Sequence, residues 1–252
     1  DSITGQNIFT NYVETYLSLR YPEAKLTFFN AGWSGDDAAG GLKRIERDVI
    51  KLKPSLVTIC YGMNDGGSSG WSKEIGDKYS ENLTKIVEII KKNGARVILL
   101  TPGIVEPNKQ VKQIYIHILS KLAICTIEVG HREQVPVYDL NALMSEIQEK
   151  GKSYTYNFTL LTADGVHPNP SGHLVMAYAL LSAMGVPERR DVVKLIPDIN
   201  QKDLYRFSLK RMPLFIDKEA RPVLEVLPFI KAFNQVLLVL PDIERSLYYF
   251  KF

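Results

Sequence analysis

Cysteine and histidine are scarce in this chain of 252 residues, which holds two cysteines and four histidines. Cys60 and Cys125 are too far apart in the sequence to form the cysteine pair of a structural zinc site, and no two histidines follow the His-x-x-x-His spacing of a helical metal site. Asp36, Asp37 and Asp65 offer carboxylates, but without such a spacing. The sequence therefore predicts two buried free thiols and no metal centre.

Long apolar runs and a strong net charge are also missing. A membrane-spanning helix needs about 20 apolar residues, and the chain has no uninterrupted run of that length. The formal net charge is only +3, and Lys and Arg are scattered rather than gathered in the basic patch that nucleic acid requires. The sequence thus predicts no transmembrane segment and no nucleic-acid partner.

Apolar segments of strand and helix length alternate along the first 187 residues. Positions 56–61 form a continuous apolar run, typical of a strand that is buried on both faces. The pattern predicts strands over 26–29, 56–61, 96–100 and 135–138, and helices over 8–19, 38–52, 77–92, 111–128, 140–150 and 171–184. Such alternation predicts an α/β domain in which helices cover both faces of a parallel sheet.

The pattern of polar and apolar residues changes after residue 187. Positions 189–203 are polar and irregular, and β-like runs follow, including 236–240 and 247–252. We therefore expect two parts: the α/β domain over 1–187 and a small, incomplete, β-rich accessory segment over 188–252.

Two short motifs at opposite ends of the predicted domain carry reactive side chains. The chain opens with DSITG, and positions 164–168 read DGVHP. A serine becomes a nucleophile when a histidine takes its proton and a carboxylate holds that histidine in the correct tautomer. Ser2, His167 and Asp164 can supply these roles, because one tight turn brings a carboxylate to the histidine three residues later. A serine here is also a common helix N-cap, and His173 is a rival base, although its place inside the next predicted helix favours a structural role.

Two intermediate segments, NAGWSGD at 30–36 and YGMND at 61–65, can supply hydrogen-bond donors. Gly35 has no Cβ, so its backbone N–H can approach a substrate closely. Asn64 can direct its side-chain amide to the same point, together with the N–H of Ser2. Such donors form an oxyanion hole, which stabilises the negative charge of a tetrahedral intermediate. A turn glycine and an ordinary polar turn are the alternative interpretations.

The four segments, in this order, resemble the four blocks of the SGNH (GDSL-type) hydrolase family. The resemblance covers residues 1 to about 185. It implies a three-layer α/β/α sandwich with a parallel, flavodoxin-like sheet, and hydrolysis of esters through an acyl-enzyme without a cofactor. It assigns the nucleophile to Ser2, the acid and base to Asp164 and His167, and the oxyanion donors to Ser2, Gly35 and Asn64.

One feature of the family is absent from the chain. Family members carry a glycine and a central strand directly before the nucleophile, and here nothing precedes Asp1. That strand would lie between the predicted strands at 26–29 and 56–61, and both would otherwise expose unpaired edges. Since unpaired buried backbone groups cost about 1–3 kcal/mol each, we expect the sequence to be a fragment without its first central strand.

The expected function is a serine ester hydrolase that deacetylates carbohydrate or cleaves another small acyl ester. The resemblance implies the carbohydrate, because family members with a similar start and a β-rich extension often act on it. A lysophospholipase-type lipid esterase is one alternative, although no apolar lid is visible. A non-catalytic carbohydrate-binding or interaction module that keeps the family pattern is another. A secreted or periplasmic location is favoured, and the sequence does not indicate an oligomeric state.

Overall fold

The computed structural model describes residues 1–66, 70–108 and 111–186. Its sheet has three parallel strands, β1 (Leu56–Cys60), β2 (Arg96–Leu100) and β3 (Val137–Tyr138), in the order β1-β2-β3. Arg96 pairs with Leu56 and Leu100 with Cys60, so β1 and β2 run in register along their whole length. Four of the five β2 residues are buried, as expected for a strand that helices cover on both faces.

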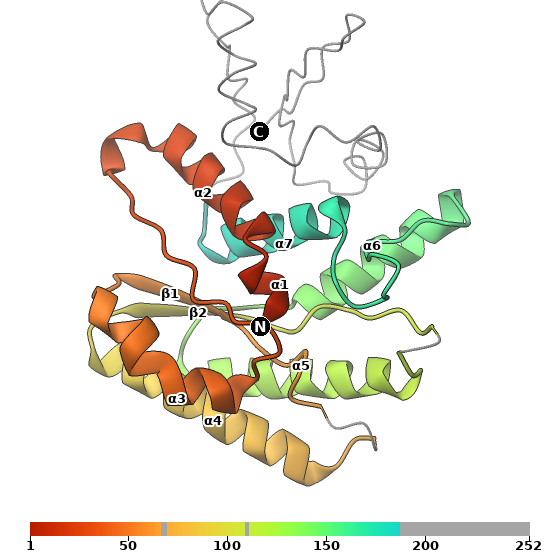
Figure 1. The fold of residues 1–252 in the computed structure, drawn as a ribbon, viewed down its shortest axis with the longest axis horizontal. Helices are drawn as coiled ribbons and strands as arrows, with labels where there is room; N and C mark the ends of the chain where they lie inside the picture. Colours follow the sequence, from red (N-terminus) through yellow and green to blue (C-terminus); the bar gives the residue numbers. More distant parts are fainter. Residues whose placement is uncertain (67–69, 109–110, 187–252) are drawn as a thin grey trace, which may run out of the picture. The chain divides into compact units, whose positions relative to one another are not determined.

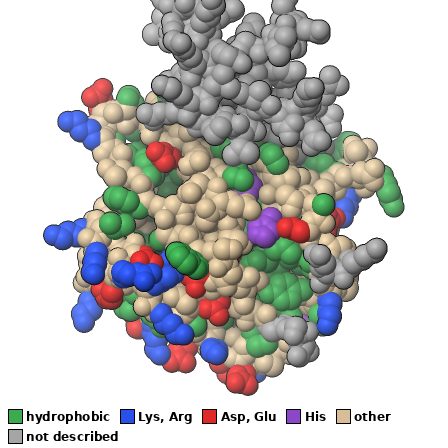
Figure 2. All heavy atoms as spheres, viewed as in Figure 1, with side chains coloured by type: hydrophobic (Ala, Val, Ile, Leu, Met, Phe, Trp, Pro, Cys, Tyr) green, Lys and Arg blue, Asp and Glu red, His purple; other side chains and the backbone are tan. Residues whose placement is uncertain are grey.

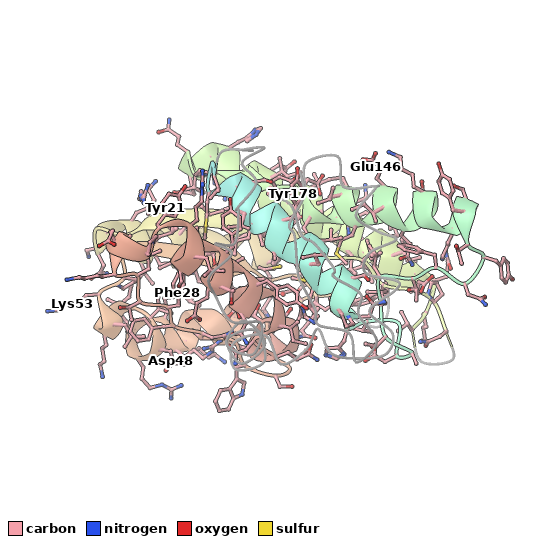
Figure 3. The ribbon with its side chains drawn as sticks, turned by 90° about the horizontal axis from the view of Figure 1, so that it is seen from above. Tyr21, Phe28, Asp48, Lys53, Glu146 and Tyr178 are labelled. Atoms are coloured by element: carbon pink, nitrogen blue, oxygen red, sulfur yellow. The ribbon has the colours of Figure 1, made fainter. Side chains whose placement is uncertain are left out.

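Helices form a layer on each side of this sheet (Figure 1). On one side α2 and α6 pack against α7, and on the other α4 packs against α3 and α5. Seen from above, Tyr178 on α7 lies between the end of α2, marked by Tyr21, and Glu146 on α6 (Figure 3). The helices are α1 (Ser2–Gly5), α2 (Ile8–Arg20), α3 (Ala38–Asp48), α4 (Lys73–Lys92), α5 (Ile114–Glu133), α6 (Leu140–Tyr154) and α7 (Pro170–Ala183), with 3₁₀ turns at Pro22–Ala24 and Ile50–Leu52.

Side-chain caps decide where several of these helices begin. Asp37 accepts a hydrogen bond from the Gly40 N–H at 2.7 Å and so starts α3. Asn169 accepts one from the Gly172 N–H at 3.0 Å, and Pro170 then occupies the first helical position, where it costs no hydrogen bond. Both caps directly follow the loops that hold candidate site residues, so they fix where those loops end.

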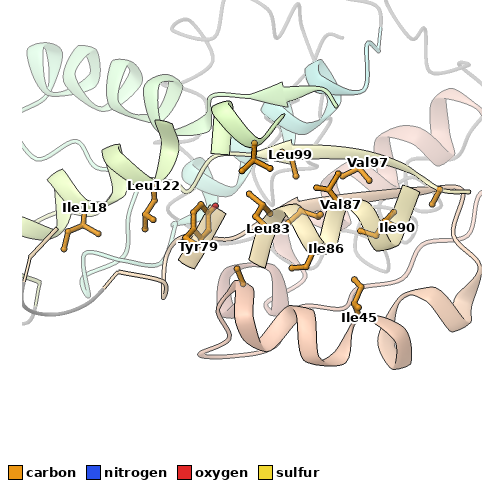
Figure 4. Close-up of a cluster of buried hydrophobic side chains, with 14 residues drawn as sticks. Ile45, Tyr79, Leu83, Ile86, Val87, Ile90, Val97, Leu99, Ile118 and Leu122 are labelled. Atoms are coloured by element: carbon orange, nitrogen blue, oxygen red, sulfur yellow. The ribbon is translucent and has the colours of Figure 1, made fainter. Parts of the chain in front are cut away.

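A cluster of buried apolar side chains lies between the sheet and the α3–α5 layer, and the Tyr79 hydroxyl in it bonds to the buried Thr126 hydroxyl at 2.8 Å (Figure 4). Leu83, Ile86, Val87 and Ile90 recur at helical spacing on α4 and are at most 1% exposed. They meet buried side chains of the other elements, namely Ile45, Ile59, Val97, Leu99, Ile118 and Leu122. Burial of a side chain of this size contributes about 1.5–3 kcal/mol, so this cluster holds the β1 and β2 strands, and the loops after them, in place.

The α/β architecture predicted from the sequence is confirmed, with one wrong element. The predicted strand at 26–29 is an irregular segment, and Phe29 in it is 62% exposed. A strand exists only through hydrogen bonds to a neighbour, and no neighbouring strand pairs with this segment among the described residues. The predicted accessory segment, 188–252, lies outside the described residues, and so does the strand at 236–240.

Other predicted boundaries moved by a few residues. Helix α4 begins four residues earlier than predicted, because Ser72 caps it with a 3.3 Å hydrogen bond from the Ile75 N–H. Helix α5 begins at Ile114 rather than at 111 and continues to Glu133. The predicted helix over 38–52 divides at Asp48 into α3 and a 3₁₀ turn.

Helix α5 is the one described helix that is long and apolar enough to cross a membrane by length and composition. It packs against α4 and the sheet, with Ile118, Leu119 and Leu122 buried. Core helices of soluble proteins pass the same test, so this property gives weak evidence for a membrane span.

Candidate active site

The nucleophile candidate stands at the first turn of α1. The Asp1 carboxylate accepts hydrogen bonds from the N–H groups of Ile3, at 2.9 Å, and Thr4, at 3.2 Å, and thereby caps the helix. Ser2 follows the cap directly, and its Oγ lies 2.9 Å from Nε2 of His167. Asp1 bonds to Ile3 and Thr4 rather than to Ser2, so the Ser2 N–H stays one of the first-turn donors that a helix leaves unsatisfied.

A closed loop carries the histidine and its carboxylate. The Thr162 N–H donates to the His167 carbonyl at 2.8 Å, which closes the loop. Asp164 Oδ1 accepts from the N–H groups of Val166, at 2.8 Å, and His167, at 2.9 Å, while its Oδ2 lies 2.6 Å from His167 Nδ1. A carboxylate can only accept, so Nδ1 carries the proton and Nε2 is left to accept the hydrogen bond from Ser2.

The hydrogen bonds also keep the Asp164 carboxyl ionised. Desolvation raises its pKa, but the hydrogen bonds from Val166, from His167 and from the Thr162 hydroxyl oppose it, and together they hold the pKa well below its usual range. The group is therefore an anion whenever His167 is neutral. It can stabilise the imidazolium that forms when His167 takes a proton.

The Gly35 loop is bonded to the helix that carries Ser2. Asn30 donates from Nδ2 to the Thr4 carbonyl at 2.7 Å and accepts from the Gly32 N–H at 2.7 Å. Gly35 has φ +74°, in the left-handed region that favours glycine. Arg44, on α3, holds the same loop from its other side by donating to the Ala31 carbonyl at 2.7 Å and to Asp36 Oδ2 at 2.8 Å.

The turn after β1 brings Asn64 to this loop. Asn64 Nδ2 donates one hydrogen bond to the Asp36 carbonyl at 2.9 Å, which leaves its second N–H for another acceptor. The side chain is exposed. Tyr115 fixes the turn by donating to the Met63 carbonyl at 2.5 Å. The structure therefore brings Asn64 beside the residue that follows Gly35, as an oxyanion hole would require.

His173 lies apart from this arrangement. Its ring is fully buried and stacks on Phe9 with centroids 6.3 Å apart, and its Nε2 lies 3.1 Å from Gln6 Oε1. Burial, with a smaller contribution from His167, lowers its pKa to about 4. The structure places it as a packing residue that joins α7 to the end of α1, and not as a base for Ser2.

The pair of His167 and Asp164 opens to the surface, with side chains 29% and 41% exposed. Figure 2 shows a histidine side chain open on the front face beside a carboxylate, with hydrophobic side chains gathered next to them. A substrate can therefore reach the histidine from solvent while part of it contacts an apolar surface. Among the described residues, no group of three or more His, Cys, Asp or Glu side chains could hold a metal ion.

Three site residues were not predicted from the sequence. Arg44 and Tyr61 join the Gly35 loop to β1, since the Tyr61 hydroxyl lies 3.2 Å from both Arg44 Nη2 and Asp36 Oδ2. Asp65 joins the turn after β1 to α3. Arg44 also forms an ion pair with Asp48, and their spacing of four residues on a helix predicts that contact. The contacts of Asp65 and Tyr61 join segments that are far apart in the sequence, so no local spacing predicts them.

At Gly32 the loop that contains Gly35 comes very close to the backbone of α1, the helix that carries Ser2. A Cβ placed on it would lie 2.3 Å from the Gly5 nitrogen and 2.7 Å from the Thr4 carbonyl carbon, both backbone atoms of α1. We expect Gly32→Ala to push α1 away from the Gly35 loop, and a displacement of about 1 Å can lower kcat about 10²-fold. Steady-state kinetics with p-nitrophenyl acetate would measure this.

Gly94→Ala is the matched control. Gly94 has φ +82°, and a Cβ there would meet nothing within 4 Å. The strain should lower stability by about 1–2 kcal/mol and leave kcat unchanged. Equal losses of kcat in both variants would show that Gly32 acts only through general stability.

Comparison with known proteins links this geometry to a family. Residues 1–175 match the GDSL-like Lipase/Acylhydrolase family. An acetylxylan esterase from Geobacillus stearothermophilus is 28% identical over 183 residues, which cover 70% of this chain and 80% of that protein. A solved structure of an acetylxylan esterase from that organism has a TM-score of 0.59 and 26% identity, covering 71% of this chain and 81% of the other.

Two further relatives act on other compounds according to their names. The isoamyl acetate-hydrolyzing esterase of Saccharomyces cerevisiae is 26% identical over 179 residues, covering 64% of this chain and 69% of that protein. The structure of a gut microbial diltiazem-metabolizing enzyme has a TM-score of 0.61 and 26% identity over 73% of this chain, which spans 45% of the length of that protein. The two solved structures share the fold of this chain, and the names of the two esterases specify an acetate ester.

Proposed function

Since the chain belongs to the GDSL-like Lipase/Acylhydrolase family and is a carboxylic ester hydrolase, we propose that Ser2, His167 and Asp164 form its catalytic triad and that acetylated carbohydrate is its substrate. One observation carries the triad: Ser2 Oγ, His167 and Asp164 form a continuous chain of hydrogen bonds of 2.9 Å and 2.6 Å. Residues 165 positions apart in the sequence meet here in the order that nucleophilic catalysis needs.

In the first half of the reaction, His167 Nε2 takes the proton of Ser2 Oγ as Oγ attacks the ester carbonyl carbon. The carbonyl π electrons move to oxygen, and the N–H groups of Ser2, Gly35 and Asn64 stabilise that oxyanion. The intermediate then collapses, the bond to the alcohol oxygen breaks, and His167 returns its proton to that oxygen. The alcohol leaves, and the acyl group remains on Ser2.

In the second half, water replaces the alcohol. His167 takes a proton from water as its oxygen attacks the acyl carbon, and the same donors stabilise the second oxyanion. Collapse breaks the bond to Oγ, His167 returns the proton to Ser2, and the carboxylic acid leaves. In each half, His167 takes one proton and returns it, so the reaction needs no metal or organic cofactor. Asp164 stabilises the imidazolium in both halves.

The names of the relatives support acetate as the acyl group. Acetylxylan and isoamyl acetate differ entirely in their alcohols, one a polysaccharide and the other a short branched alcohol, and share only the acetyl group. Carbohydrate is supported by the acetylxylan esterase and by Trp33, whose side chain is 65% exposed in the same loop as Gly35. A flat aromatic ring beside an oxyanion loop can stack on the apolar face of a sugar.

We expect Trp33→Ala to lower kcat/KM for acetylated xylooligosaccharides about 3–10-fold, the size of one aromatic contact. The value for ethyl acetate should not change, because its alcohol is too small to reach a second contact. Tyr156→Ala removes another exposed aromatic side chain, 92% exposed, and serves as control. An equal loss for both substrates would show that Trp33 does not recognise the sugar.

The function is tested by acetate release from acetylated xylooligosaccharides and by p-nitrophenyl acetate hydrolysis, each with a fluorophosphonate probe whose adduct is mapped by mass spectrometry. The chain is assayed as it stands and with a family-like strand ending in glycine placed before Asp1. We expect hydrolysis of both esters and a probe adduct on Ser2. Hydrolysis of p-nitrophenyl acetate alone would refute the carbohydrate substrate. Folded protein that is silent toward both esters and the probe in both forms would refute the triad.

A further inference from the structure

One carboxylate joins the two loops that carry the candidate oxyanion donors. Asp65 Oδ1 accepts a hydrogen bond from the Ala38 N–H at 2.9 Å, and Oδ2 accepts one from the Gly62 N–H at 2.9 Å. Ala38 is the first residue of α3 and lies three residues after Gly35, while Gly62 opens the turn that contains Asn64. The two oxygens of a single side chain therefore hold both loops.

The geometry points to Asp65 as the positioning residue of the oxyanion hole, which sets the separation between the Gly35 N–H and the Asn64 amide. This inference rests on the proposed function, because it assumes that these donors stabilise an oxyanion. A second contact acts in parallel, since Asn64 itself donates to the Asp36 carbonyl at 2.9 Å. Together the two contacts leave little freedom for one loop to move relative to the other.

The surroundings of Asp65 argue against a purely stabilising role. The side chain is half-buried, and burial raises its pKa to about 6, against the hydrogen bonds from Ala38 and Gly62, which favour the carboxylate. The charged and titratable groups that face it are Asp37 before α3, Tyr79 on α4, Tyr115 on α5 and the amino group of Asp1. A raised carboxyl pKa means that the fold is less stable with the ionised group above pH 6, so the charge is kept at a cost in stability.

Ionisation matters because both partners of Asp65 are N–H donors. An ionised carboxyl offers a good acceptor to each of them. A protonated one keeps a good acceptor only on its carbonyl oxygen, because its O–H oxygen accepts weakly and its proton competes with the facing N–H. We call the two hydrogen bonds that Asp65 accepts, from Ala38 and from Gly62, the clamp. Both are strong above about pH 6, and one of them weakens as the pH falls below that value. Hydrolysis should therefore weaken in acid as Asp65 becomes protonated, with an apparent pKa near 6.

Asp65→Asn tests the inference, because asparagine keeps the shape but has one acceptor and turns its NH₂ toward an N–H. We expect kcat for p-nitrophenyl acetate to fall about 10–100-fold, with KM within about two-fold. The fall of kcat/KM near pH 6 that protonation of Asp65 causes in the wild type should be absent from the variant. Removal of a desolvated charge stabilises the fold and loss of one acceptor destabilises it, so the melting temperature should change by no more than about 4 °C.

Asp37→Asn is the matched control. Asp37 also bonds to the first turn of α3, by accepting from the Gly40 N–H at 2.7 Å, but it does not touch the Gly62 turn. Asparagine is an equally good N-cap, so kcat above pH 7 should keep its wild-type value. The fall in acid should persist at a lower pH, because loss of the Asp37 charge removes one cause of the raised pKa of Asp65. Unchanged kcat in Asp65→Asn, or an equal loss in Asp37→Asn, would overturn the inference.

A double-mutant cycle separates positioning from general structure. If Asp65 acts through the oxyanion donors, Asp65→Asn should cost much less in an Asn64→Ala background than in the wild type. Equal factors in the two backgrounds would assign Asp65 a structural role only.

An NMR titration needs no activity and keeps the inference apart from the proposed function. The amide signals of Ala38 and Gly62 should shift together with an apparent pKa near 6, and neither should shift in Asp65→Asn. Independent behaviour of the two signals would refute the clamp even in an active enzyme. Joint titration in a protein without Ser2-dependent hydrolysis would instead refute the proposed function.

Discussion

Replacement of Ser2 by alanine is expected to lower kcat for p-nitrophenyl acetate by about 10⁴-fold or more. The Oγ atom forms the new bond to the acyl carbon, so without it no acyl-enzyme can form, and His167 can only activate water directly. Removal of a nucleophile from a triad leaves the residual rate enhancement that the oxyanion donors and substrate binding supply.

The fold should tolerate this change. Within the described part of the chain, the Ser2 side chain makes one hydrogen bond, the 2.9 Å contact with His167 Nε2, whose loss costs about 1 kcal/mol. The α1 cap is unaffected, because it is made by Asp1. A Ser2→Ala variant whose melting temperature falls by no more than about 4 °C, and which forms no fluorophosphonate adduct, would therefore locate the defect in the chemistry.

Ser153→Ala provides the control for loss of a serine hydroxyl. Ser153 is exposed, and its Oγ donates within its own helix to the Lys150 carbonyl at 2.7 Å. It should retain full activity and full labelling. If Ser2→Ala kept more than about a tenth of the wild-type activity, the nucleophile would have to be another group, and the triad would be wrong.

The local parts of this site were visible in the sequence, and the long-range parts were not. Asp164 and His167 lie three residues apart in a turn, so their contact follows from spacing alone. The approach of Ser2 to His167 crosses 165 positions, and it could be inferred only because four segments together resembled a known family. Contacts such as that of Asp65 with Ala38 depend on how β1 and α3 pack, and no pattern in the chain encodes them.

The same distinction explains the errors in the fold. Strand β2 was predicted to the residue, because its apolar run and flanking turns are local signals. The segment at 26–29 has the composition of a strand, but a strand also needs a paired neighbour, and none of the described residues supplies one. Helix boundaries moved where a cap decided them, as at Ser72. Composition thus predicted the type of element better than its existence or its ends.

Replacement of Asp164 by asparagine is expected to lower kcat by about 10⁴-fold through a change of tautomer. Asp164 Oδ1 accepts hydrogen bonds from the N–H groups of Val166 and His167 and from the hydroxyl of Thr162. An asparagine would keep its carbonyl oxygen at this position, since three donors converge there. Its NH₂ would then replace Oδ2, 2.6 Å from His167 Nδ1.

An NH₂ group donates, so Nδ1 of His167 would have to accept, and the proton of the neutral ring would move to Nε2. Nε2 could then no longer accept the proton of Ser2 Oγ, although every atom stays within reach. Nitrogen-15 NMR of His167 would detect the exchanged tautomer, and kinetics with p-nitrophenyl acetate would measure the loss.

Thr162→Val is the control: it removes only one of the three donors to Oδ1 and should keep the wild-type tautomer, with at most about a ten-fold loss of kcat. A wild-type tautomer in Asp164→Asn, with activity close to normal, would mean that the carboxylate orients His167 but is not needed to select its proton.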